Sequence, residues 1–260
     1  MTSLIVKDEV RSTNIDALEL IRNGKVNETT IISAKEQTEG VGRNGKKWNS
    51  DGGLAISIVD STNLPAERVT ELSLLSAVVA RDAMKNAAPD INVTLKWPND
   101  LMVNGKKIGG INLETAIEGK NISYVVIGIG INVDKFPVLS QTSSVVYKAT
   151  SFKDEGVEIK IEDLVNHISE SFSRWSGIFN DGQGFAEIRK EWLDNSAVKP
   201  GQKIKVNRNE EETIEGNFKG LDKNGKMLVE AISGKIRVVD YGEVTGGAMF
   251  ATIEPLVQGK

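Results

Sequence analysis

Apolar residues recur at helical spacing in four stretches of the chain. The first predicted helix follows Ser12, whose hydroxyl can cap it, and stops before Gly24, a residue typical of helix ends. The second begins at Pro65, because proline is favoured in the first turn of a helix, and continues to about Asn86. Two further helices are predicted at residues 161–178 and 185–193.

Extended patterns fill the segments between these helices. Asn104-Gly105 separates two of them, and this dipeptide is the strongest short-range signal for a β-hairpin. Pro98 disfavours a helical conformation for the residue before it, so the preceding run is also expected to be extended. The strands predicted in this part of the chain cover residues 29–34, 54–59, 93–97, 101–103, 106–114 and 122–133.

The pattern changes after Ala197. Short alternating segments separated by glycine turns predict a small all-β module of about five strands. Four of these strands fall at 203–206, 213–221, 226–231 and 235–239. We therefore expect two domains, a mixed α and β body at 1–196 and a compact β-barrel at 197–260.

The composition excludes several classes of site and protein. A chain of 260 residues without cysteine has no disulfide framework, no thiolate metal site and no cysteine nucleophile. The formal charge of −4 differs from the basic balance of most DNA-binding proteins. The charged N-terminus does not resemble a secretory signal, and the longest apolar stretch is too short to span a bilayer. We expect a soluble cytoplasmic protein that binds neither nucleic acid nor membrane.

Residues 40–48 read Gly-Val-Gly-Arg-Asn-Gly-Lys-Lys-Trp. They match two phosphate-binding motifs, but the residues that follow do not fit either motif. The dinucleotide fingerprint GxGxxG needs a helix directly after it, whereas this loop leads to a predicted strand. The P-loop pattern GxxxxGK needs serine or threonine next, and this chain has Lys47. The glycines and cations such as Arg43 still favour anion binding, and Trp48 offers a flat face to an adenine. The alternative is a basic surface turn with a packed tryptophan.

A second polar constellation follows the predicted strand that ends at Pro98. Asn99 and Asp100 lie at the predicted bend, where they can hold a magnesium ion or orient a lysine. Lys107 can meet a carboxylate or a phosphate, and Gly109-Gly110 lets a ligand approach the strand backbone. Each feature also has a plain structural interpretation, as a turn, a solvated hairpin or a bulge.

Five motifs in this order resemble the biotin–protein ligase family, over nearly the whole chain. They are Ser12-Thr13-Asn14, Gln37 with the glycine-rich loop that follows it, Lys96 to Asp100, Lys107 to Gly110, and Gly128 to Val133. Gly242-Glu243-Val244 also lies where the C-terminal domains of this family close. The resemblance implies an α+β fold with a mixed, largely antiparallel sheet and flanking helices, similar to class II aminoacyl-tRNA synthetases. A small C-terminal SH3-like β-barrel is implied as well.

The same resemblance implies an ATP-dependent ligase. Such an enzyme activates biotin with ATP to biotinyl-5'-AMP, with Mg²⁺ present, and then transfers biotin to a lysine of a biotin carboxyl carrier protein or domain. Both substrates are anions, so the expected task of the site is charge neutralisation and alignment. A homodimer is expected by analogy alone.

Family roles carry over to the positions that match. The residues expected to bind biotin are Ser12, Thr13, Asn14, Gln37, Gly40, Val41, Gly42, Arg43, Lys107 and Gly110. Those expected to bind ATP are Arg43, Lys46, Trp48, Asn99, Lys107 and Asn132. The expected catalytic residues are Arg43, Lys107 and Asp100, and Asp100 is also the expected metal ligand.

The loop departs from the family pattern at two positions. The family often carries arginine where this chain has Val41 and Lys46. A valine forms no side-chain ion pair, so any role of Val41 must involve its backbone. Lysine also lacks the bidentate geometry by which arginine binds phosphate.

Three other functions are weighed against a biotin ligase. A lipoate– or octanoate–protein ligase resembles this body in fold and chemistry, but its ligand has no ureido ring that would need Thr13 and Gln37. A biotin-sensing DNA-binding repressor needs a winged-helix domain, for which we expect no room before Ser12. A catalytically inactive biotin-binding module would not need both Arg43 and Lys107. The single histidine, His167, lies away from every motif and is expected to be structural or exposed.

Overall fold

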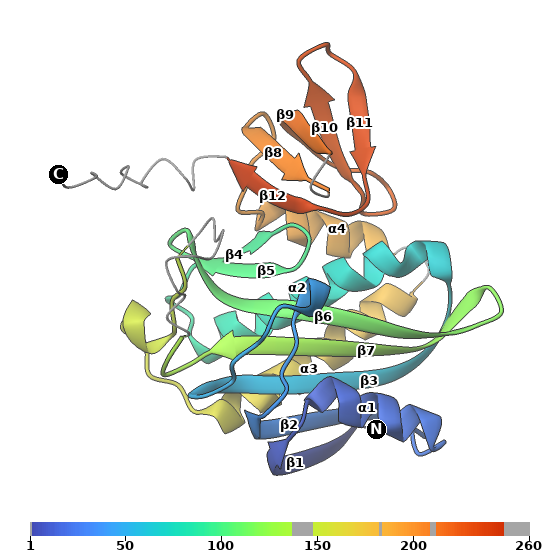
Figure 1. The fold of residues 1–260 in the computed structure, drawn as a ribbon, viewed down its shortest axis with the longest axis vertical. Coiled ribbons are helices and arrows are strands. Elements are labelled where there is room, and N and C mark those ends of the chain that lie inside the picture. The colour runs from blue at the N-terminus through green and yellow to red at the C-terminus, as the bar shows by residue number, and fades with distance from the viewer. Residues whose placement is uncertain (1, 137–147, 182–183, 209–211, 247–260) are drawn as a thin grey trace.

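The computed structural model describes residues 2–136, 148–181, 184–208 and 212–246 of the chain (Figure 1). It contains a seven-stranded and a five-stranded β-sheet, with helices packed on the larger sheet. This combination of helices and sheets confirms the coarse fold class predicted from the sequence. Among the described residues, no helix is both long enough and apolar enough to cross a bilayer.

The larger sheet has the strand order β1-β2-β3-β7-β6-β5-β4. β1 and β2 are parallel and are connected by α1, whereas every other neighbouring pair is antiparallel. The predicted mixed, largely antiparallel sheet is therefore confirmed. Its strands are β1 (Thr2–Val10), β2 (Thr29–Gln37), β3 (Gly53–Pro65), β4 (Val93–Lys96), β5 (Asp100–Val103), β6 (Lys106–Glu118) and β7 (Asn121–Asn132).

The two faces of this sheet are covered differently. α2 (Val69–Ala87) and α3 (Ile161–Asn180) pack over the main core, to which Ile127, Ile129 and Ile131 of β7 contribute. The alternate β7 residue Val126 belongs to a separate cluster with Ala17 of α1 (Thr13–Arg22). Because successive side chains of a strand point to opposite faces, α1 lies on the face opposite α2 and α3.

The β5–β6 hairpin is confirmed as predicted. Its turn residues Asn104 and Gly105 both have positive φ, 50° and 73°, as a type I′ turn requires. The turn sets the register in which Asp100 pairs with Gly110, and a bulge follows at Leu101/Met102. Two sequence motifs that are ten residues apart are thereby placed side by side on neighbouring strands.

Two elements differ from the sequence prediction. β1 was not predicted, because its side chains are mostly exposed and give no apolar alternation; backbone pairing with β2 defines it. Pro65 does not begin a helix as predicted. It is the last residue of β3, where it pairs with Asn121, and a short 3₁₀ turn separates it from α2. A proline is tolerated at a strand end because it needs no ladder donor there.

The five-stranded sheet is antiparallel throughout, with the order β11-β10-β9-β8-β12. Its strands are β8 (Lys203–Asn207), β9 (Thr213–Leu221), β10 (Met227–Ala231), β11 (Ile236–Val239) and β12 (Glu243–Gly246). α4 (Gly184–Asp194) lies beside it and packs against β9 (Figure 1). Buried residues of this sheet belong to the same apolar cluster as the main core, so the two sheets are packed through a continuous interior.

We predict that Gly225→Ala loosens the packing of the smaller sheet on the helices. Gly225 has φ +81°, and an added Cβ would lie 2.7 Å from Cδ1 of Leu74 and 3.0 Å from Cζ of Phe185. Gly234 has φ +78° and open space around it, so Gly234→Ala has the same backbone cost without the clash. Urea unfolding should show Gly225→Ala less stable than Gly234→Ala by about 1–3 kcal/mol. Equal losses would contradict this packing.

Candidate functional site

Two glycines of β7 form the floor of a site on the α1 face of the larger sheet. An added Cβ at Gly128 would lie 2.4 Å from Oδ1 of Asn14, and at Gly130 it would meet the Trp48 indole at 2.3 Å. Only residues without a side chain allow such close approach. The motif 128–133 therefore supplies a flat backbone surface on which side chains from two distant segments lie.

Polar side chains gather at the N-terminus of α1. The Thr13 backbone N–H donates to Oε1 of Gln37 at 2.8 Å, and Oγ1 of Thr13 lies 3.2 Å from the same oxygen. Ser57 Oγ lies 2.7 Å from Thr13 Oγ1. Ser12, Thr13 and Asn14 are all buried, so these groups form a preorganised polar cluster rather than a solvated helix end.

The glycine-rich loop folds back on itself above this floor. The Gly42 N–H donates to the Lys46 carbonyl at 2.7 Å, and the Trp48 N–H donates to the Gly40 carbonyl at 2.8 Å. Gly40 is buried, and a Cβ there would lie 2.9 Å from Nε2 of Gln37. The first residue of the loop therefore lies against Gln37 of the polar cluster. Val41 is 47% exposed, which is consistent with a role through its backbone alone.

Trp48 joins the loop to the floor. Its half-buried indole covers Gly130, and within the described part of the chain its buried Nε1 has no hydrogen-bond partner. Lys46, two residues before Trp48, is exposed and lies 3.5 Å from Glu243 of β12. This exposed ion pair connects the loop to the five-stranded sheet.

The charged residues predicted from two distant motifs meet at one point. Nη1 of Arg43 donates to Oδ1 of Asn99 at 3.0 Å, and Nζ of Lys107 lies 2.5 Å from Oδ1 of Asp100. Since Asn99 and Asp100 are consecutive, the guanidinium and the ammonium are held at the same bend of the chain. The Lys107 ammonium also lies across Gly110, 3.3 Å from where a Cβ would be.

Asp100 is shared between two lysines. Its second oxygen, Oδ2, lies 3.1 Å from Nζ of Lys96, which is only 2% exposed. Burial lowers the pKa of Lys96, and the Asp100 carboxylate opposes this shift. Lys96 and Lys107 thus flank one carboxylate, Arg43 contacts the neighbouring Asn99, and the net positive charge of these groups favours the binding of an anion.

A segment that sequence patterns left unassigned supports Lys107 and Asn132. Thr150 donates its N–H to the Lys107 carbonyl at 2.9 Å, and its own carbonyl accepts from Nδ2 of Asn132 at 2.8 Å. Asn132 is buried, with 4% of its surface exposed. Its hydrogen bond to Thr150 therefore anchors the end of β7, which forms the floor of the site. Thr150 lies in an aperiodic stretch and gave no signal. Ser57 could have been found, because it is a polar residue within an apolar strand.

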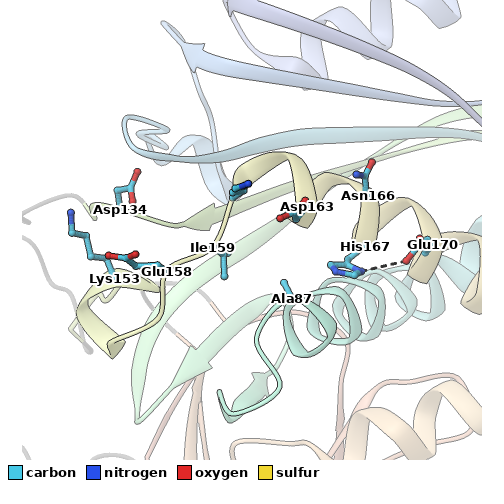
Figure 2. A pocket seen from close by; sticks show the side chains of 10 residues that line it. Ala87, Asp134, Lys153, Glu158, Ile159, Asp163, Asn166, His167 and Glu170 are labelled. Carbon is cyan, nitrogen blue, oxygen red and sulfur yellow. Dashed lines mark hydrogen bonds and ion pairs between the residues drawn. The ribbon is translucent and has the colours of Figure 1, made fainter.

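A cavity of about 740 Å³ lies elsewhere, between the end of α2, the start of α3 and the segment before it (Figure 2). Its lining mixes acidic and basic side chains and includes none of the predicted site residues. His167 lines it and lies 3.3 Å from Oε2 of Glu170, as Figure 2 shows. The single histidine is therefore remote from the charged cluster, as predicted.

Known proteins with similar sequences and structures are ligases. Residues 6–132 match the biotin/lipoate A/B protein ligase family, and residues 201–245 match the biotin protein ligase C-terminal domain. The biotin–[acetyl-CoA-carboxylase] ligase of Paracoccus denitrificans is 30% identical, over 91% of this chain and 97% of the relative. The bifunctional ligase/repressor of Bacillus subtilis is 31% identical, over 89% of this chain and 70% of that protein.

A solved structure supports the same relationship. The biotin protein ligase from Aquifex aeolicus in complex with biotin and ATP is 26% identical, with a TM-score of 0.70. The match covers 94% of this chain and 97% of that one. The likeness therefore extends over both sheets.

We predict that Asp100→Asn destabilises the fold, because it leaves the buried Lys96 without its carboxylate. The loss should be about 3–5 kcal/mol near neutral pH. The pKa of Lys96 is already lowered by burial and should fall further in the variant. The deficit is then largest where Lys96 is charged and should narrow as the pH rises through the lowered pKa of the Lys96 ammonium. Urea unfolding of the wild type and the variant at several pH values measures this loss of stability.

Asp194→Asn is a matched control, since Lys190 and Asp194 form an exposed pair with the same spacing. Because both partners are exposed to solvent, it should change stability far less than Asp100→Asn does. Equal losses in the two variants, or an Asp100→Asn deficit that grows with pH, would contradict the assignment.

Proposed function

The chain belongs to the biotin–protein ligase family, and we propose that its charged cluster is where biotin is joined to ATP. The enzyme activates biotin to biotinyl-5'-AMP and then transfers biotin to a lysine of a biotin carboxyl carrier protein or domain. One observation carries this proposal: Arg43 and Lys107, 64 residues apart by number (107 − 43), meet at the consecutive residues Asn99 and Asp100. Two cations at one point fit a reaction between a carboxylate and a phosphate.

In the first step a carboxylate oxygen of biotin attacks the α-phosphorus of ATP, and pyrophosphate leaves. Both reactants are anions, so the barrier falls when fixed positive groups offset their repulsion. We assign this role to Arg43 and Lys107. Lys107 is 27% exposed in its side chain and can reach a ligand, whereas Lys96 is enclosed. In the second step the acceptor amine attacks the acyl carbon, loses a proton and displaces AMP.

Asp100 has two proposed roles, and the geometry favours one of them. Each of its oxygens already contacts a lysine ammonium, so the carboxylate is suited to positioning Lys107. It is poorly arranged to bind a metal, and no group of three carboxylate or imidazole side chains suited to a metal occurs among the described residues. We therefore assign no step to a protein-held ion and expect Mg²⁺ to enter with the ATP phosphates.

The polar cluster at α1 is the proposed site of the biotin ring. A ureido group presents two N–H donors and one carbonyl, and Thr13 and Gln37 offer matched partners. Ser12, Asn14, Gly40, Val41, Gly42 and Gly110 complete the proposed biotin site. The glycine-rich loop would then enclose the adenylate and limit its hydrolysis.

The nucleotide is proposed to lie beyond the carboxylate of biotin. Trp48 offers its indole to the adenine, and Asn99 and Asn132 lie at the border of the same region. Lys46 is also assigned to ATP, although it contacts Glu243 in the structure. A move of Lys46 from Glu243 to phosphate would link ATP binding to the smaller sheet.

Finer features of the architecture remain proposals. We propose a catalytic domain at 1–196, related in topology to class II aminoacyl-tRNA synthetases, and an SH3-like barrel at 197–260. The five antiparallel strands from β8 to β12 support the second assignment. We also propose a cytoplasmic location, where ATP and the carrier protein are available, and a homodimer by analogy with related enzymes.

Lipoate or octanoate ligation is the second candidate, because one matching family description covers lipoate ligases as well. The polar cluster of the buried Thr13 and Ser57 and the half-buried Gln37 argues against it. A ligand with an apolar tail would leave these groups unpaired, which is costly in a closed site.

We predict that the enzyme catalyses biotin-dependent exchange of labelled pyrophosphate into ATP. Adenylate formation is reversible, so exchange reports the first step without the acceptor protein. Lipoate and octanoate at the same concentration should support little exchange. Equal or faster exchange with either acid would contradict the choice of biotin.

We further predict different defects for Lys107→Ala and Arg43→Gly. Lys107→Ala should slow adenylate formation, because it removes a charge at the reacting carboxylate. Arg43→Gly should still form the adenylate but release it early, so that lysines of unrelated proteins become labelled. Labelled biotin with ATP, followed by trapping of the adenylate in solution, separates the two results. Identical behaviour of the variants would contradict the separate roles.

A further inference from the structure

We infer that Glu114, a residue of β6 outside the proposed ligand contacts, sets the direction of the hydrogen bonds that recognise the biotin ring. It acts through Asn14 and Ser57 and is therefore a positioning residue for Thr13. This inference rests on the proposed function, since it assumes that the polar cluster at α1 binds the ureido ring.

The first step fixes the side-chain amide of Asn14. Oε1 of Glu114 lies 2.8 Å from Nδ2 of Asn14. A carboxylate only accepts hydrogen bonds, so it selects the orientation in which the NH₂ group of Asn14 faces Glu114. The amide oxygen of Asn14 must then face the opposite direction, toward Ser57. Gly128 beneath it leaves the space that this arrangement needs.

The second step fixes the hydroxyl of Ser57. Its Oγ lies 2.5 Å from Oδ1 of Asn14, and the residue is fully buried. The amide oxygen has no proton, so Ser57 must donate its single proton to Asn14. Toward its other neighbour, Oγ1 of Thr13 at 2.7 Å, Ser57 can then act only as an acceptor.

The third step fixes the two groups that face the ligand. Thr13 then donates its proton across this 2.7 Å contact to Ser57, so its longer contact to Oε1 of Gln37, at 3.2 Å, carries no proton and its Oγ1 offers only lone pairs to a ligand. Oε1 of Gln37 accepts the Thr13 backbone N–H at 2.8 Å, so the NH₂ end of Gln37 is turned toward Gly40 and the loop. The cluster thus presents one acceptor, Thr13, and one donor, Gln37. A ureido edge carries the complementary pair, an N–H beside a carbonyl.

Glu114→Gln tests this relay with little change in volume. A glutamine can present its own NH₂ group to Asn14, which allows the Asn14 amide to turn around. Ser57 then accepts from Asn14 and donates to Thr13, which occupies a lone pair of Thr13 and frees its proton to turn toward Oε1 of Gln37 or the ureido N–H. Thr13 then presents a weaker acceptor to the ureido N–H, which should raise the KM for biotin about tenfold or more.

The experiment uses biotin-dependent pyrophosphate exchange with the full chain. Glu114→Gln should raise the KM for biotin while the KM for ATP and the rate at saturating biotin change less than about twofold. Glu114→Asp keeps an acceptor-only group and should restore most of the affinity for biotin. Glu118→Gln is the matched control, because Glu118 is an exposed residue of the same strand and should behave as wild type.

A second comparison separates the relay from a general loss of packing. Ser57→Ala interrupts the relay, so adding Glu114→Gln to it should cause little further loss of affinity. The inference is overturned if Glu114→Gln binds biotin like wild type, if it weakens biotin and ATP equally, or if the two substitutions are additive. A wild-type protein without biotin-dependent exchange would instead refute the proposed function itself, which distinguishes the two failures.

Discussion

One carboxylate, that of Asp100, organises the charges on which the site depends. It lies between Lys96 and Lys107, with one oxygen directed to each ammonium. Burying a lysine such as Lys96 is costly unless an opposite charge accompanies it, so the pair is held in one geometry. Asp100 thereby offsets the enclosed ammonium and fixes the more accessible one. We propose that Lys107 and Arg43, held in this way, act together on an anionic substrate.

The larger sheet supports this cluster of charges because one of its faces packs the core and the other face holds the site. On one face the isoleucines of β7 pack against α2 and α3 and stabilise the fold. On the other face, Gly128 and Gly130 leave the backbone bare, and α1 and the glycine-rich loop lie directly on it. The same strand therefore anchors the core and forms the floor of the site. A rigid support of this kind suits a reaction whose main requirement is alignment.

Sequence patterns predicted the elements with strong local signals. Capping residues located α1, the Asn104-Gly105 turn located the β5–β6 hairpin, and apolar periodicity located α3. They failed for β1, whose existence depends on a neighbour rather than on its own residues, and for Pro65, which occurs at strand ends as well as helix starts. The motif residues of the site were predicted because the family resemblance supplied them. Residues that hold the motif residues in place, such as Thr150, were not predicted, because a hydrogen bond between segments far apart in the sequence leaves no local pattern.

The central claim is that Arg43 and Lys107 act together on one carboxyl–phosphoryl junction. A double-mutant cycle with Arg43→Met and Lys107→Met tests it most directly, with binding of a stable, non-hydrolysable biotinyl-adenylate analogue measured by calorimetry. If both cations contact the same junction, the sum of the losses in the two single variants will differ from the loss in the double variant by more than about 0.5 kcal/mol. Losses that add within about 0.3 kcal/mol would show that the two cations act at separate places and would contradict the account.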